Sequence, residues 1–143
     1  MNKVSKNKNS ITIFGYSDIS NFIVESFLKS SKNYDITLIV DQKDNSKSSS
    51  LVRTSNKITL KKENLSDTHV INEIDYKNNL LTILATNDTK LNILSAALIK
   101  STFSTNNIYC CINDLKYDEL FNAKGIEIFY PWNLPPKLKH FWK

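Results

Sequence analysis

Short apolar runs alternate along the chain with segments in which apolar residues recur every three or four positions. The runs are of strand length and rich in β-branched residues, so each predicts a buried β-strand. They occupy residues 10–14, 35–41, 57–61, 79–86, 107–113 and 126–130. The helical spacing predicts helices over 18–31, 66–74, 87–102 and 114–125. This alternation predicts a Rossmann-like, three-layer α/β fold with a mostly parallel sheet of about six strands.

Two of the predicted helices have a clear apolar face. The side chains expected to face the core are Ile19, Phe22, Ile23 and Phe27 in the first helix, and Leu91, Leu94 and Ala97 or Leu98 in the helix over 87–102. Asp18 is placed to cap the first helix, and Asp88 or Thr89 the other. Gly125 ends the last predicted helix.

The 143 residues fit one domain, with a core large enough to fold without disulfides or metals. We expect residues 1–9 to be a flexible N-terminus and residues 10–131 to be the Rossmann-like domain. Pro135 and Pro136 interrupt a helix in the last segment, so residues 132–143 are predicted to form an extended C-terminal tail.

Composition and charge exclude several classes of protein. No apolar run approaches the roughly 18 residues of a membrane span and no signal peptide is visible, so we expect a cytoplasmic protein without direct membrane insertion. The net charge of +5 comes from lysines scattered among acidic residues, with no basic block, so no nucleic-acid partner is predicted. Adjacent Cys110 and Cys111 would face opposite sides of a strand, which predicts two buried thiols.

The loop after the first strand is the main candidate site. Dinucleotide-binding loops use three glycines, for a tight turn, for approach of the pyrophosphate and for packing of the helix. Here Gly15 is followed by Ser17 and Ser20 at the other two positions, and Ser17 would place its hydroxyl where a pyrophosphate comes closest. Amides at the start of a helix still suit an anion. The candidate phosphate contacts are Gly15, Tyr16, Ser17, Asp18 and Ile19.

Asp41 is a candidate contact for an adenosine ribose. It ends the second predicted strand, 26 positions after Gly15, where an acidic residue usually accepts hydrogen bonds from ribose hydroxyls. The alternative is that Asp41 only begins a turn. If Asp41 binds ribose, it would repel a 2′-phosphate, which favours NAD or ADP-like ligands over NADP.

Four segments extend this pattern over about residues 10–131. They are ITIFGYSDISNFIVESFL, DITLIVDQKD, TILATNDTKLNILSAALIK and IYCCINDLKYDELFNAKGIEIFYP. Together they resemble the TrkA-N domain, also called the RCK or KTN domain, a nucleotide-binding regulator of potassium channels and transporters. The resemblance implies NAD(H) or ATP/ADP as ligand and a potassium channel or transporter membrane subunit as partner. It also implies a homodimer or larger assembly at a cytoplasmic position, peripheral to the membrane through that partner.

The resemblance also implies roles for individual residues. Beyond Gly15 and Asp41, it places Asn64 and Leu65 near an adenine edge, and Thr86, Asn87 and Asp88 in the loop after the central strand. Asn92 matches an asparagine of the family's helix. The alternatives are an ordinary exposed helix residue for Asn92 and a helix cap for Asp88.

Departures from the family pattern leave three functions open. Ser17 and Ser20 replace glycines, Asn64 follows Glu63 where the family often has Gly-Asp, and Cys111 replaces a frequent arginine. Each change removes a nucleotide contact, so one alternative is a degenerate scaffold without a ligand.

The other alternative is an atypical short-chain NAD(P)-dependent oxidoreductase. None of the six tyrosines begins a Tyr-x-x-x-Lys motif, and neither His69 nor His140 is placed to act as a base, so no enzyme is predicted. A nucleotide sensor remains the main hypothesis. Its copies would touch around Leu115, Leu120 and Phe121, unless these side chains belong to the core.

Overall fold

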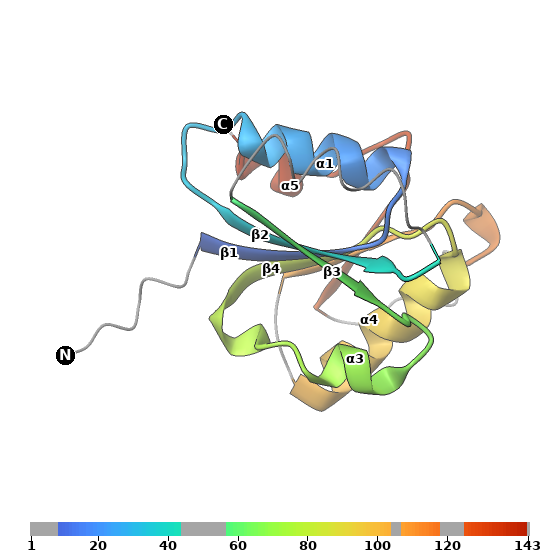
Figure 1. Ribbon diagram of the computed structural model, residues 1–143. Coiled ribbons are helices and arrows are strands. Elements are labelled where there is room, and N and C mark those ends of the chain that lie inside the picture. Colours follow the sequence, from blue (N-terminus) through green and yellow to red (C-terminus); the bar gives the residue numbers. More distant parts are fainter. Residues whose placement is uncertain (1–8, 44–56, 104–106, 118–124, 143) are drawn as a thin grey trace.

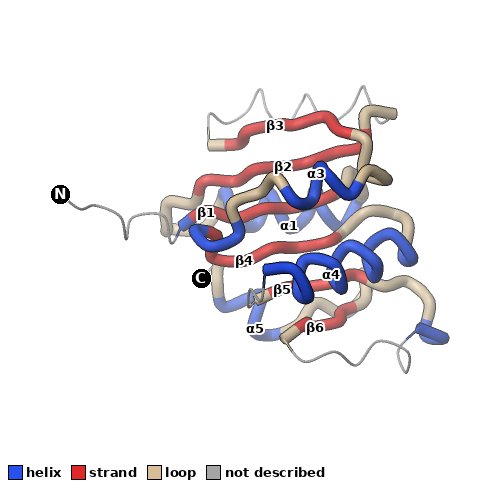
Figure 2. Tube along the Cα trace, turned by 90° about the horizontal axis from the view of Figure 1, so that it is seen from below, coloured by secondary structure: helices blue, strands red, loops and turns tan. Residues whose placement is uncertain are grey.

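In the computed structural model, which describes residues 9–43, 57–103, 107–117 and 125–142, one sheet organises the chain. Its six strands are all parallel and lie in the order β3-β2-β1-β4-β5-β6 (Figure 2). Their bounds are Ser10–Phe14 (β1), Asp35–Asp41 (β2), Ile58–Glu63 (β3), Asn79–Leu84 (β4), Ile108–Cys111 (β5) and Ile126–Phe129 (β6). The predicted Rossmann-like α/β fold is confirmed.

Helices cover both faces of this sheet (Figure 1). Helices α1 (Asp18–Leu28) and α5 (Pro136–His140) lie on one face, and α3 (Thr68–Asn72) and α4 (Thr89–Phe103) lie on the other. This arrangement gives the three layers that the alternation of strands and helices predicts.

Side chains of the strands divide between two core clusters, because successive residues of a strand point to opposite faces. Ile11 and Ile13 of β1 pack with α1, whereas Phe14 packs on the α4 side. Cys111 and Cys110 divide in the same way, and both are buried free thiols, as predicted. Burial on both faces explains why these strands are apolar almost throughout.

Two side chains predicted to face the core are instead more than half exposed: Leu94 (68%) and Phe22 (52%). The buried residues are Thr89, Asn92, Ser95, Ala96 and Ile99 within α4, and Ser20, Ile23, Val24 and Phe27 within α1. Both buried faces include small residues, which let a helix approach the sheet closely. The spacing of large apolar residues alone does not reveal such a face.

The C-terminal segment contains a helix, so the predicted extended tail is wrong. Helix α5 begins at Pro136, where proline is tolerated because its missing N–H would have no partner within the helix. Leu138 is fully buried in the core cluster on the α1 side. The Tyr34 hydroxyl also donates a hydrogen bond to the Phe141 carbonyl. The two prolines therefore start a helix that folds back onto the domain.

Other predicted elements change in length. The helix predicted over 66–74 is the shorter α3, followed by a 3-10 helix, η2 (Tyr76–Asn78). The helix predicted over 114–125 begins as a 3-10 helix, η3 (Leu115–Tyr117), and residues 118–124 lie outside the described residues. Residues 1–8 of the predicted N-terminus lie outside them as well. Of the predicted dimer contact only Leu115 is described, and it is 63% exposed.

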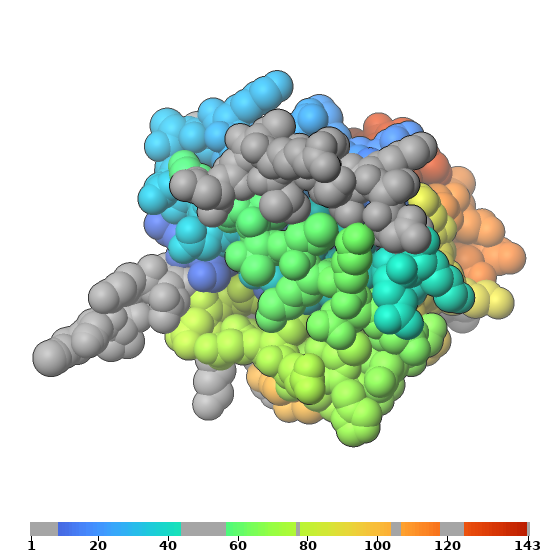
Figure 3. Space-filling model, in the orientation of Figure 1, coloured from blue at the N-terminus to red at the C-terminus, as the bar shows by residue number. Residues whose placement is uncertain are grey.

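Strand β3 forms one edge of the sheet that the structure describes. It carries the exposed residues Lys61 and Lys62, and with α3 it occupies the middle of the face in Figure 3, in green. Charged side chains on an edge strand disfavour pairing with another sheet. The exposed edge of β3 is therefore a poor surface for pairing with another sheet.

Candidate functional site

The strand order creates a crevice at the carboxyl end of β1. From β1 the sheet grows toward β2 and β3 on one side and toward β4, β5 and β6 on the other, and open α/β sheets bind ligands at such a reversal. A cavity of about 380 Å³ lies here, and we call it the switch-point cavity. Its lining residues are Gly15, Tyr16, Asp41, Lys43, Leu65, Ser66, Thr86, Asn87, Asp88 and Leu91. Most of the predicted contacts line it, but Ser17, Asp18, Ile19 and Asn64 do not.

Gly15 is required by the close approach of two loops. Its φ is +108°, and a Cβ at this position would lie 2.5 Å from the Thr86 Cα and 2.8 Å from the Ala85 carbonyl carbon. Its N–H donates a hydrogen bond to the Ile39 carbonyl at 2.7 Å. Gly15 therefore serves the packing of the β1–α1 turn against the loop after β4, in addition to any approach of a ligand.

Ser17 is the N-cap of α1, where Asp18 was predicted to be. The Ser17 Oγ accepts a hydrogen bond from the Ser20 N–H at 3.0 Å, and the Ser20 Oγ accepts one from the Ser17 N–H at 2.8 Å. The Ser17 hydroxyl also donates to the Ala85 carbonyl at 2.7 Å. Both serines are buried, so the Ser17 hydroxyl serves the fold and does not stand where a pyrophosphate would approach.

This capping box leaves two amides of α1 unused. Among the described residues, no acceptor bonds the N–H of Asp18 or of Ile19, and both amides lie where the helix carries partial positive charge. Their side chains line a second cavity instead of the switch-point cavity. Tyr16 is half-buried and lines the switch-point cavity. Only the backbone of Asp18 and Ile19 is therefore available to an anion.

Asp41 lines the cavity from the end of β2. Its Oδ1 accepts a hydrogen bond from the Lys43 N–H at 3.0 Å, so Asp41 begins a turn as well. The other carboxylate oxygen still has lone pairs for hydroxyl groups of a ligand. Lys43 lines the same cavity and adds a cation that the sequence pattern did not single out. Its position two residues after the end of a strand was the available signal.

Asn64, like Ser17, Asp18 and Ile19, is a predicted contact that does not line the cavity. Its side chain is exposed, and its Oδ1 accepts a hydrogen bond from the Ser66 N–H at 3.1 Å within the turn before α3. The turn meets the cavity through Leu65 and Ser66 instead. Leu65 is almost fully buried and supplies an apolar wall.

Asn92 fixes the loop after β4 and is not an exposed helix residue. Its Oδ1 accepts hydrogen bonds from the Thr86 N–H at 3.1 Å and the Thr86 hydroxyl at 2.6 Å. Its Nδ2 donates to the Thr86 carbonyl at 3.0 Å and to the Cys111 carbonyl at 2.9 Å. The side chain is 1% exposed. Asn92 therefore joins the ends of β4 and β5 and shapes one wall of the cavity.

The loop of residues 86–88 combines structural and free groups. The Asp88 Oδ1 accepts a hydrogen bond from the Leu91 N–H at 3.2 Å, which makes Asp88 a cap for α4. The Thr86 hydroxyl accepts another from the Asp88 N–H at 3.1 Å. Asn87 is exposed, and its side chain has no hydrogen-bond partner in the described part of the chain. Asn87 is thus the side chain of this loop that is free to bind a ligand.

The site suits hydrogen bonding to a polar ligand more than metal or thiol chemistry. The described residues hold no group of three His, Cys, Asp or Glu that could bind a metal. Separately, none of the described helices is long and apolar enough to cross a membrane. Burial raises the pKa of the Cys110 and Cys111 thiols to about 12, so both are protonated and unreactive at neutral pH. The available groups are amides, carboxylates, hydroxyl groups and one lysine.

A comparison with protein-family models agrees with this geometry. The model of the TrkA-N domain matches residues 11–131, which include every strand of the sheet except the first residue of β1. The chain belongs to the TrkA-N domain family. A comparison with curated proteins found no match. TrkA-N domains are Rossmann-type nucleotide-binding regulatory domains of potassium transport.

The position of Cys111 in this TrkA-N domain shows what one departure from the family pattern means for ligand binding. Cys111 stands where the family often has an arginine, and its side chain is 3% exposed in the core on the α1 side. Only its carbonyl faces the loop after β4, through the bond to Asn92. Cys111 therefore offers no side-chain contact to a ligand in the switch-point cavity.

Proposed function

We propose that this TrkA-N domain binds an adenine nucleotide, NAD(H) or ATP/ADP, in the switch-point cavity and thereby regulates potassium transport. The observation that carries the proposal is the convergence of Gly15, Asp41 and the loop of residues 86–88 on one cavity, from the ends of three strands. Its volume of about 380 Å³ is typical of small-molecule sites.

The ribose and the adenine have counterparts in the cavity, and the phosphates have one at the adjoining start of α1. Asp41 accepts hydrogen bonds from the ribose hydroxyls, and Leu65 supplies an apolar wall for the adenine. The phosphates lie toward the unused amides of Asp18 and Ile19, because those amides carry the positive end of α1. A 2′-phosphate would meet the Asp41 carboxylate, so NADH is preferred to NADPH, although Lys43 partly offsets the repulsion.

Regulation would follow from binding alone. A ligand shifts an equilibrium between two arrangements of packed domains by the difference in its affinity for them. The proposed partners are a potassium channel or transporter membrane subunit and a second copy of this domain. They would hold the domain at a cytoplasmic position beside the membrane. The 63% exposed Leu115 is part of the proposed contact between copies.

A thermal-shift titration of the full chain with NADH, NAD, ATP, ADP and NADPH tests the proposal. We expect saturable stabilisation by at least one adenine nucleotide, since a ligand at 100 times its dissociation constant stabilises a fold by about 2.7 kcal/mol. NADPH should stabilise less than NADH. Equal responses to both would contradict the assigned role of Asp41.

Two further outcomes would favour the alternatives. No response to any nucleotide, with the fold intact, would support a scaffold without a ligand. Turnover of NADH with a carbonyl substrate, followed by loss of its absorbance, would support an oxidoreductase.

A further inference from the structure

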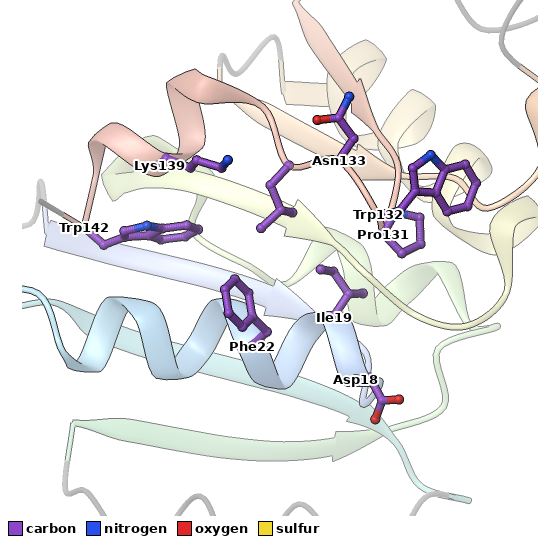
Figure 4. Close-up of a pocket in the computed structure, with 9 residues that line it drawn as sticks. Asp18, Ile19, Phe22, Pro131, Trp132, Asn133, Lys139 and Trp142 are labelled. Atoms are coloured by element: carbon purple, nitrogen blue, oxygen red, sulfur yellow. The ribbon is translucent and has the colours of Figure 1, made fainter.

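A second depression lies between α1 and the C-terminal segment, and we call it the aromatic groove (Figure 4). Its volume is about 650 Å³, within the range of small-molecule sites. Ile19 and Phe22 rise into it from α1, while Trp132 and Trp142 stand toward its two ends. It is separate from the switch-point cavity, because the two share no lining residue.

The walls of the groove are aromatic and unusually exposed. Phe22 is 52% exposed and Trp132 is 65% exposed, although large apolar side chains of this kind are generally buried. The Trp142 ring meets the Phe22 ring edge-on, with centroids 6.5 Å apart and an interplanar angle of 89°. The Trp132 ring is stacked on Tyr130 at 5.2 Å and 12°. Ring contacts therefore hold these walls in place before a ligand arrives.

Charge within the groove is asymmetric. Lys139 and Asp18 lie toward opposite ends, and neither forms a salt bridge within the described residues (Figure 4). Asp18 is the first residue of α1, so the partial positive charge of the helix offsets its carboxylate. Lys139 lies in the last turn of the five-residue helix α5, whose dipole offers much less compensation. The uncompensated charge of the groove is thus the Lys139 ammonium.

We propose that the aromatic groove binds a small organic anion with a flat, apolar body. The body lies against Phe22 and its neighbours, and a carboxylate or sulfonate points to Lys139. Among the described residues, Lys139 is the one cationic side chain that lines the groove, so the groove suits a single anionic group and not the several phosphates of a nucleotide. The inference does not depend on nucleotide binding in the switch-point cavity.

A pair of fluorescent probes tests the proposal on the full chain. 1-Anilinonaphthalene-8-sulfonate carries one anionic group, and N-phenyl-1-naphthylamine has nearly the same apolar body without it. We expect both to bind saturably and Phe22→Ala to weaken both. Lys139→Met should weaken only the sulfonate, by about three- to five-fold, as for an exposed ion pair. Both positions are exposed, so the fold should survive these changes.

The matched control is Lys137→Met in the same helix. Its Nζ lies 3.9 Å from the Glu127 carboxylate and it does not line the groove, so both affinities should stay unchanged. The proposal is overturned if neither probe binds saturably, or if Lys137→Met has the same effect as Lys139→Met. It is also overturned if NADH displaces the sulfonate probe competitively, because the probe then occupies the switch-point cavity.

Discussion

At Gly15 an added methyl group has no room. In Gly15→Ala the Cβ would lie 2.5 Å from the Thr86 Cα in a backbone with φ of +108°, and backbone atoms cannot move aside as a flexible side chain does. We expect a loss of about 3 kcal/mol or more in the free energy of unfolding, measured in urea. Gly125→Ala is the control for the backbone penalty, because Gly125 also has a positive φ, of +86°, but its Cβ meets only the movable end of the Lys100 side chain, so this change should cost less than Gly15→Ala. A loss as small as about 1 kcal/mol for Gly15→Ala would contradict this packing.

The two buried thiols predict a loss of stability at alkaline pH. Burial raises the pKa of Cys110 and Cys111 to about 12, whereas unfolded thiols titrate near pH 8.5. The part of the free energy of unfolding that depends on the protonated thiols is fully present below about pH 8.5. It is lost as pH rises toward 12, because thiolates form in the unfolded chain at lower pH than in the folded chain. Melting temperatures between pH 7.5 and 10 should decline, and less steeply in a variant with both cysteines replaced by alanine. Equal slopes would contradict the raised pKa values.

Single residues differ in how far the sequence reveals their roles. Gly15 and Asp41 could be placed at the cavity because Gly15 directly follows β1 and Asp41 ends β2, and the carboxyl ends of parallel strands lie at one edge of the sheet. The direction of the Ser17 side chain could not, since its partner, the Ala85 carbonyl, is 68 residues away in sequence. The sequence also does not reveal that Asn64 is exposed and Asn92 is buried, because both depend on contacts made by the folded chain.

Among the elements, the loop between β4 and α4 depends on one side chain. Asn92→Leu would leave the Thr86 amide, the Thr86 carbonyl and the Cys111 carbonyl without their partner. An unpaired buried group costs about 1–3 kcal/mol; the bond to Cys111 is buried and the two bonds to Thr86 are partly buried, so we expect a loss of about 3 kcal/mol in the free energy of unfolding. Leu94→Ala, at a 68% exposed position of the same helix, should change stability by only about 0.5 kcal/mol. Similar losses for the two variants would contradict the role given to Asn92.

Helix α5 contributes a buried side chain to the core. Leu138→Ala removes a fully buried side chain and should cost about 2–5 kcal/mol on unfolding in urea. Lys137→Ala, next to it on the exposed side, should cost little. If both variants unfold like the parent chain, the C-terminal segment does not pack as described.

Elements are predictable to the extent that their apolar pattern is local. The six strands and the helices α1 and α4 follow from such patterns, and their order follows from alternation. The start of α5 at Pro136 was missed because the two prolines were interpreted only as helix breakers, although proline suits the first position of a helix. The inward face of α4 was missed because small and polar residues form it.

For the whole molecule, strand order decides where the switch-point cavity forms. The reversal at β1 brings the ends of β1, β2 and β4 to one cavity, which no single segment of sequence contains. The sequence predicted this cavity through the fold class, and predicted its polar wall through Asp41. Lys43 was missed although it lies two residues after the end of β2, and Ser66 was missed because nothing in its local sequence distinguishes it from other loop residues.

Isothermal titration of NADH and of ADP into the full chain, with Asp41→Ala and Asp35→Ala compared, measures whether the switch-point cavity holds a nucleotide. Both residues belong to β2. Asp41 ends the strand at the cavity, whereas the exposed Asp35 begins the strand at its amino end, on the side of the sheet away from the cavity. The account predicts binding of at least one of the two nucleotides to the parent chain, a loss of about tenfold or more in Asp41→Ala and no change in Asp35→Ala. Equal affinity in Asp41→Ala, or binding of neither nucleotide to the folded parent chain, would contradict it.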